Sequence, residues 1–206
     1  MLEKAMSIGL VAVVFGSVPV SAQDTAQNTA AILQTWRTAC ADPNPDLAIG
    51  YLQEAMVTKN RLVNRVCLRQ VLESDNADVR STALRIVVGS VPLIRFRVSK
   101  PEGEIGNNAQ LWSYIQTGLV FQSVDGDPQN GSATWQSLVA NAQPNKNLTG
   151  QVDVFGTGLR WAGRVQIGVA TSTCRLSAEL TQGDAISGTF QCEAGPLFPV
   201  TASLLD

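Results

Sequence analysis

The chain contains no histidine among its 206 residues. Imidazole is the general base of Ser-His-Asp and Cys-His catalysis and a ligand in the usual catalytic zinc sites, so the sequence excludes these mechanisms. Charged residues are also scarce, at 16% against 45% hydrophobic residues. This composition is typical of one or two globular domains and not of a disordered chain.

Long hydrophobic runs are missing after the first 20 residues. The apolar run 5–20 follows Lys4 and ends at the small residues Ser21 and Ala22, which is the pattern of a secretory signal peptide. The run is shorter than the ~20 residues that a membrane helix needs. We therefore expect residues 1–22 to be a signal peptide, the mature chain to have no membrane span, and the protein to be periplasmic or secreted.

Cysteine occurs four times. Since exported proteins fold in an oxidising compartment, four cysteines predict two disulfides. No two of them lie close together in the sequence, as the ligands of a structural zinc site do, so we expect no metal. Spacing alone leaves three pairings open for the four residues Cys40, Cys67, Cys174 and Cys192.

Residues 23–93 have the signals of three or four short helices. Strong helix formers occur at 30–34 and 52–56, and turn residues at 42–45 and 58–60 separate them. A further amphipathic helix is predicted by apolar spacings of three and four at Leu62, Val63, Val66, Cys67 and Val71.

The sequence also predicts where this amphipathic helix ends and the next begins. Polar residues at 74–76 stop it, and Asp75 or Asn76 can cap the following helix. The apolar face of that helix is expected to consist of Val79, Ala83, Ile86 and Val87.

Residues 72–84 read LESDNADVRSTAL and resemble the corner between the two helices of a HEAT repeat. The resemblance covers about one repeat, at residues 60–90. HEAT modules are stacked helix pairs that usually serve as interaction scaffolds, so the resemblance implies a binding role and not chemistry. About three repeats normally form a stable solenoid, and the sequence has no second copy of the motif, so a small helical cap on another domain is the alternative.

Charge is distributed unevenly along the chain. Residues 59–100 have a net charge of +6, whereas residues 101–206 have −5. Arg61, Arg65 and Arg69 form one stripe along a helix, which can bind an anionic or protein partner such as a phosphate-bearing glycan, a lipid head group or an acidic protein. The alternative is a solvated helix face that also touches the acidic C-terminal region. We expect no nucleic-acid partner, because the chain is exported and its sequence pI is 5.2.

Residues 148–204 alternate apolar and polar side chains, as the strands of a meander do. Hairpin registers that place apolar residues opposite each other can be found on paper. They place Val152 opposite Trp161 and Asp153 opposite Arg160 in the first hairpin. In the next hairpin they place Ile167 opposite Leu176 and Arg164 opposite Glu179.

The third hairpin register predicts the disulfides. It places Leu176 opposite Phe190 and therefore Cys174 opposite Cys192. Facing residues of antiparallel strands lie ~4.5 to 5.5 Å apart at Cα, which is within disulfide range. We therefore predict the pair Cys174–Cys192, which leaves Cys40–Cys67. The last hairpin is predicted to place Phe190 opposite Val200.

Three more strands are expected within 111–124 and 132–139. The predicted fold class is thus α+β: a HEAT-like helical region at 23–93 followed by an antiparallel β-meander at 94–206, closed as a small barrel or packed as a sandwich. Trp135 and Trp161 share the apolar face. They are either core residues or the lining of a ligand pocket.

We find no convincing catalytic pattern. Residues 125–131 are similar to a calcium loop but lack the glutamate at its twelfth position, and Asp153 and Glu179 have predicted arginine partners. The sequence therefore predicts a non-catalytic exported binding module without cofactor or metal, of unspecified oligomeric state. The alternatives are a barrel that carries a small apolar ligand and, less favoured, a hydrolase without histidine.

Overall fold

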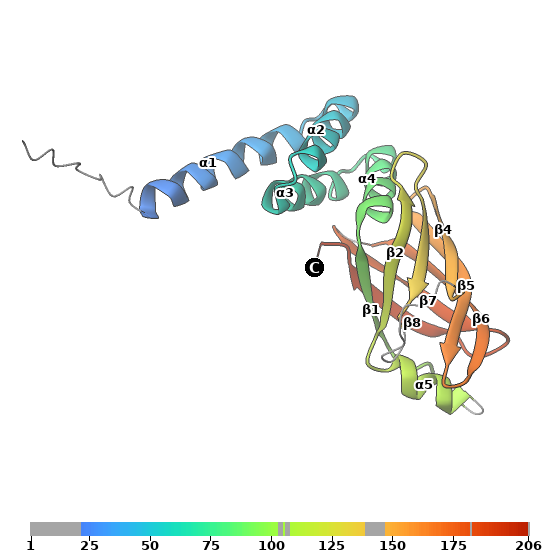
Figure 1. Ribbon diagram of the computed structural model, residues 1–206. Helices are drawn as coiled ribbons and strands as arrows, with labels where there is room; N and C mark the ends of the chain where they lie inside the picture. The colour runs from blue at the N-terminus through green and yellow to red at the C-terminus, as the bar shows by residue number, and fades with distance from the viewer. Residues whose placement is uncertain (1–21, 103–104, 106–107, 139–146, 182, 206) are drawn as a thin grey trace, which may run out of the picture.

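The computed structural model describes residues 22–102, 105, 108–138, 147–181 and 183–205. The predicted signal peptide lies outside them, apart from its last residue. Four helices come first, and a β-barrel follows them along the chain (Figure 1). Among the described residues, no helix combines the length and the apolar character that crossing a membrane would take.

Each of the helices α2 to α4 begins at an asparagine. The side chains of Asn44, Asn60 and Asn76 accept hydrogen bonds from backbone N–H groups of the first turn that would otherwise lack a partner. Of the two caps that the sequence offered for α4, Asp75 and Asn76, the structure uses Asn76. The four helices are α1 (Ala22–Cys40), α2 (Pro45–Val57), α3 (Arg61–Leu72) and α4 (Ala77–Ser90).

The C-terminal part is a closed barrel in which each strand pairs antiparallel with the next and β8 pairs with β1. The predicted α+β fold class is therefore confirmed, as a barrel and not as a sandwich. The strands are β1 (Leu93–Val98), β2 (Leu119–Asp127), β3 (Ser132–Ser137), β4 (Thr149–Phe155), β5 (Gly158–Ile167), β6 (Ala170–Leu180), β7 (Ala185–Cys192) and β8 (Phe198–Ser203).

Two predicted registers are confirmed. Strands β4 and β5 place Val152 opposite Trp161. Strands β6 and β7 place Cys174 opposite Cys192, and a disulfide with a Cα–Cα distance of 3.9 Å joins them. The second disulfide, Cys40–Cys67, is also as predicted and joins the last turn of α1 to α3 at a Cα–Cα distance of 5.1 Å.

The predicted register of β5 and β6 is wrong. Trp161, and not Ile167, lies opposite Leu176, and Arg164 faces Thr173 instead of Glu179. The cause is the turn, which lies at Gly168, three residues before the expected place. Gly168 has φ +64°, a conformation that glycine adopts without steric cost, so the chain turns there and both strands are long.

The last hairpin and one upstream strand are also corrected. Phe190 lies opposite Phe198 and not Val200, so the loop before β8 is longer than predicted. The start of the predicted strand region 111–124 belongs to a helix, α5 (Ala109–Ile115), which buries Leu111 and Ile115. A short run of apolar residues is compatible with a strand or with a short helix, and packing in the folded chain decides which one forms.

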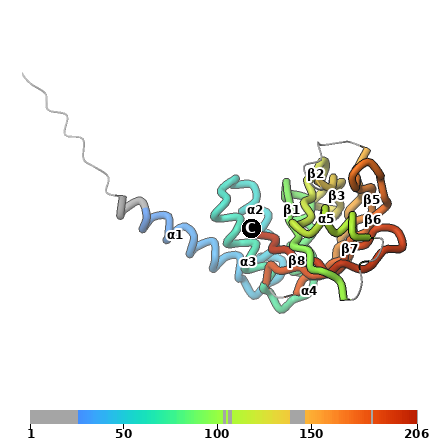
Figure 2. Tube along the Cα trace, turned by 90° about the horizontal axis from the view of Figure 1, so that it is seen from below, coloured from blue at the N-terminus to red at the C-terminus, as the bar shows by residue number. Residues whose placement is uncertain are grey.

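The two described helices next to the barrel lie at its opposite ends. Helix α4 contacts β2, β3 and β4 and leads directly into β1. Seen from below, α5 lies across the near end of the ring of strands (Figure 2), and its Trp112 stacks on Phe198 with ring centroids 6.1 Å apart. The buried side chains of helices and barrel form one continuous core.

Candidate functional site

The predicted arginine stripe lies on the outside of α3. Arg61, Arg65 and Arg69 are exposed. The opposite face of the helix is buried in the core by Val63, Cys67, Leu68, Val71 and Leu72. The periodicity of the sequence thus assigned both faces of α3, since residues four apart lie on the same side of a helix.

The structure adds a fourth arginine that the sequence analysis missed. A shallow hollow of about 100 Å³ between α1 and α3 is lined by Arg37, Arg65 and Arg69 together with apolar residues such as Leu33 and Leu62. We call it the arginine groove. It brings together Arg65 and Arg69 of the stripe with Arg37 of α1, whereas Arg61 lies at the start of α3 and not in its lining.

A signal for Arg37 was present in the sequence. It lies three residues before Cys40, so the predicted bond between Cys40 and Cys67 places it beside the stripe of α3. Its guanidinium donates to the side-chain oxygen of Gln34 at 3.2 Å, one turn earlier on α1. This contact keeps the side chain along the helix surface.

Helix stability does not explain the stripe as a whole. Arg69 in the last turn of α3 interacts favourably with the helix dipole, but Arg61 at the first position places a positive charge at the positive end. Cations at a helix N-terminus cost a few tenths of a kcal/mol, to about 1 kcal/mol. The helix dipole therefore accounts for Arg69 but not for the position of Arg61.

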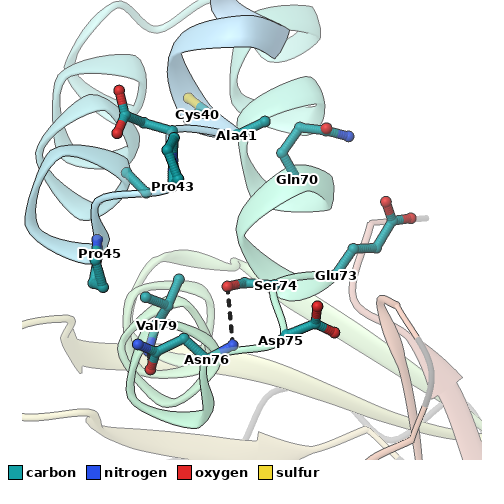
Figure 3. Close-up of a pocket in the computed structure, with 12 residues that line it drawn as sticks. Cys40, Ala41, Pro43, Pro45, Gln70, Glu73, Ser74, Asp75, Asn76 and Val79 are labelled. Atoms are coloured by element: carbon teal, nitrogen blue, oxygen red, sulfur yellow. Dashed lines mark hydrogen bonds between the residues drawn. The ribbon is translucent and has the colours of Figure 1, made fainter.

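A second hollow lies at the C-terminal end of α3, at the corners between the helices (Figure 3). Its volume is about 480 Å³, and its lining includes the acidic residues Asp42, Glu73 and Asp75. Gln70 lines this hollow and the arginine groove alike. The helical region thus presents a basic and an acidic depression that adjoin each other at Gln70.

The acidic hollow has the features of a helix corner and not of a metal centre. The backbone N–H of Asn76 donates to the Ser74 hydroxyl at 3.2 Å, as Figure 3 shows, and Arg80 donates to the Ser74 carbonyl at 2.9 Å. Over the part of the chain that the structure describes, no three His, Cys, Asp or Glu side chains gather closely enough to hold a metal ion.

The tryptophans predicted as core or pocket lining are in the core. Trp135 and Trp161 are each 1% exposed, and the ring of Phe121 contacts both at centroid distances of 5.8 and 4.8 Å. The indole N–H of Trp161 donates to the backbone carbonyl of Trp135 at 3.2 Å. A Cβ atom at Gly163 would lie 2.5 Å from the Trp161 ring, so this ring occupies the space that the glycine leaves.

The calcium-like segment is a hairpin turn capped by Asp127. Its carboxylate accepts the backbone N–H groups of Asn130 and Gln129 and the Asn130 side-chain amide at 2.6 to 3.1 Å. These hydrogen bonds, with the backbone of Asn130 the largest contribution, hold the pKa of Asp127 below its ordinary value. The carboxylate is engaged in the turn rather than aimed outward.

Of the carboxylates considered for hydrolysis, Asp153 faces Arg160 across β4 and β5 as predicted. Glu179 does not have its predicted partner, since Gly158 and Ser187 lie opposite it. Because Asp153 and Glu179 lie on different strands that are not neighbours, the barrel does not bring them together as an acid–base pair.

Comparison of the chain with models of protein families, with curated proteins and with solved structures finds no match. The class is therefore defined by the fold itself: an up-and-down β-barrel of eight strands that follows an N-terminal helical region, with two disulfides. Since one fold serves many functions, the function has to be argued from the surface of this chain.

Proposed function

We propose that the protein is an exported, non-catalytic interaction module whose arginine groove, together with Arg61, binds an acidic protein surface or another anionic partner. The observation that carries the proposal is the convergence of Arg37, Arg65 and Arg69 from two helices around an apolar floor. Guanidinium groups bind carboxylates and phosphates through paired hydrogen bonds, and apolar contacts beside them add affinity.

The exposure of the stripe favours a partner over the alternative of an internal contact. If the stripe served to hold the acidic C-terminal region, its side chains would be covered by the barrel. Instead Arg61, Arg65 and Arg69 are exposed, and the barrel is contacted through α4. The barrel therefore does not cover their side chains.

The disulfide between Cys40 and Cys67 supports the proposal in two ways. It fixes α1 against α3, so the groove is organised before a partner arrives and less conformational entropy is lost on binding. Two disulfides are also typical of proteins that fold in an oxidising compartment, which supports periplasmic or secreted localisation.

The barrel interior supports this function over that of a ligand carrier. A carried ligand needs space inside the strands, but six aromatic side chains less than 2% exposed fill the interior. They are Phe96, Phe121, Trp135, Trp161, Phe190 and Phe198. The rigid barrel then serves as a body that supports the helical region.

The test is site-specific photo-crosslinking in the producing cells. Leu62 lines the groove and is 52% exposed, so a photoreactive amino acid placed there should cross-link to the partner. Reversing the stripe with Arg61→Glu, Arg65→Glu and Arg69→Glu should reduce the cross-linked product at least about tenfold, because three favourable charge contacts become repulsive.

Two controls make the result specific. The same photoreactive residue at the exposed Val169, in the turn between β5 and β6, should give no such product. A triple reversal on the barrel, Arg160→Glu, Arg164→Glu and Arg175→Glu, changes the net charge equally and should leave the product unchanged. Cross-linking that survives reversal of the stripe, or is lost equally in both triple variants, would contradict the proposal.

A further inference from the structure

The barrel is closed over only part of the seam between β1 and β8. The paired residues are Arg97 with Thr201 and Val98 with Val200, and the N–H of Ser99 donates to Pro199 just beyond them. The other half of β1, Leu93–Phe96, is paired with β2 alone, and the end of β8 is paired with β7. The strands therefore separate towards the end of the barrel next to α4.

Hydrogen-bond directions show which backbone groups face this opening. The carbonyl of Val120 accepts from Leu138, so it points towards β3. Arg95, which lies opposite Val120, therefore points its own N–H and C=O away from β2 and towards β8. By the same alternation, the backbone groups of Leu93 also point into the opening. They form a short sheet edge on the β8 side of β1.

A hollow of about 510 Å³ occupies the opening. Arg95 and Arg97 lie in its lining on the outer face of β1, two residues and therefore ~6.5 to 7 Å apart. Apolar residues, including Leu93 at 44% exposure and the buried Leu204, line the rest. Asp184, next to the lining residue Ala185, accepts a hydrogen bond from the Ser203 hydroxyl.

We propose that this open seam binds an extended acidic peptide segment of a partner protein by strand addition. The segment pairs with the backbone of Leu93 and Arg95, and one of its carboxylates lies opposite Arg95. Thr201 already occupies the place opposite Arg97, so Arg97 reaches the added segment diagonally. Two arginines at the spacing of alternate strand residues, with no acid among the described residues of the lining, argue for an acidic occupant. The seam is separate from the arginine groove, so either proposal can fail without the other.

The test is an NMR titration of the ¹⁵N-labelled protein with acetyl-Val-Glu-Val-Glu-Val-Thr-amide. We expect saturable shifts of the backbone amides of Leu93, Arg95 and Ser203. The same peptide with an N-methyl group on every backbone amide has no N–H donor left for strand pairing and should produce no such shifts. Replacing both glutamates by lysine should abolish binding as well.

Charge reversal of the two arginines in the protein is a second test of the proposal. Arg95→Glu with Arg97→Glu should weaken binding about tenfold or more, since two exposed charge pairs of up to ~1 kcal/mol each are lost. The pair Arg160→Glu and Arg164→Glu, elsewhere on the barrel, should leave the affinity unchanged.

Several outcomes would overturn the proposal. Binding of the N-methylated peptide would show an anion site without strand pairing, and shifts confined to α3 would assign the peptide to the arginine groove. Equal shifts with anionic phospholipid vesicles would point to a membrane surface, and concentration-dependent shifts without peptide would point to a second copy of the chain. Unchanged amides of Leu93 and Arg95 at saturating peptide would reject the seam as a site.

Discussion

At the scale of single residues, Asp127 shows how a polar loop is built. Its carboxylate holds the turn between β2 and β3 through hydrogen bonds from Gln129 and Asn130. The sequence motif of acids, asparagine and glycine was compatible with an ion site or a turn. The hydrogen bonds within the turn favour the interpretation as a turn. They also lead to a prediction about the pKa of Asp127.

We expect the Asp127 carboxyl to titrate below its ordinary pKa of 3.8, and Asn130→Ala to move it back towards that value. The variant removes the side-chain donor, although the backbone donors stay. A lowered folded pKa stabilises the fold above the unfolded pKa, and this contribution is lost as the pH falls through the folded value. Carboxyl ¹³C NMR titration of both proteins measures it, and an Asp127 pKa at or above 3.8 would contradict the interpretation.

Gly163 offers a second prediction at this scale. A Cβ there would lie 2.6 Å from the Cα of Gly150 and 2.5 Å from the Trp161 ring. Gly163→Ala should therefore lower the free energy of unfolding by about 1 to 3 kcal/mol, the usual effect of overpacking. Urea unfolding followed by circular dichroism measures the change.

Gly50→Ala is the matched control. Gly50 lies within α2, and a Cβ there has nothing within 4 Å. Alanine in an unobstructed helix position should raise the free energy of unfolding by about 0.5 to 1 kcal/mol. If Gly163→Ala were as stable as the native chain, the ring of Trp161 would not occupy the place that the structure gives it.

At the scale of elements, α1 and α3 form the arginine groove because a disulfide joins them. The bond closes a loop with a sequence separation of 27 residues. The double variant Cys40→Ala and Cys67→Ala should lower the free energy of unfolding by about 3 kcal/mol, mainly because the unfolded chain regains conformational freedom. Urea unfolding checks this value.

The second disulfide is the comparison for the first. Cys174→Ala with Cys192→Ala opens a loop with a separation of 18 residues and should cost about as much, ~3 kcal/mol. Only the first variant should weaken cross-linking at Leu62, since only it releases α1 from α3. Equal loss of cross-linking in both variants would contradict a special role of Cys40–Cys67 in the groove.

Elements also show where prediction from pattern fails. The β5–β6 register that we predicted from apolar pairing differs by an even number of residues from the observed one. An even shift keeps every side chain on the same face, so alternation cannot distinguish the two. The position of the turn at Gly168 decides the register.

At the scale of the whole molecule, helices and barrel share one core. Leu84 on α4 is fully buried in it, and α4 contacts both α3 and β2. We expect a single cooperative unfolding transition, in which far-ultraviolet circular dichroism and tryptophan fluorescence give the same midpoint. The first signal reports mainly helices. The second reports largely the barrel, because Trp135 and Trp161 lie inside it and Trp112 packs against it, whereas only Trp36 lies on α1.

Leu84→Ala should lower the free energy of unfolding by about 2 to 5 kcal/mol, because it leaves a cavity in the shared core. Both signals should shift together. If the circular dichroism midpoint moved while that of fluorescence stayed, the helical region and the barrel would unfold independently.

The candidate site was predicted in part. The helix period predicted the exposed stripe of Arg61, Arg65 and Arg69, because this periodicity is local. Arg37 was missed because it lies more than twenty residues before the stripe. The seam at Arg95 and Arg97 was missed because the sequence of neither β1 nor β8 shows how many of their residues pair with each other.

The sequence by itself determined the local features: asparagine caps, helix faces, the β4–β5 and β6–β7 registers and, through them, both disulfides. Capping, periodicity and close hairpins depend on residues near each other in the chain. They can therefore be predicted from the order of residues in the sequence. Only the tertiary structure decided that the sheet closes, that residues 109–115 form a helix across the barrel, and that the seam opens beside Arg95. These features depend on how strands that are distant in the sequence pair, and on which volume of the core is left for side chains to fill. Pairing and filling are both properties of the packed chain as a whole.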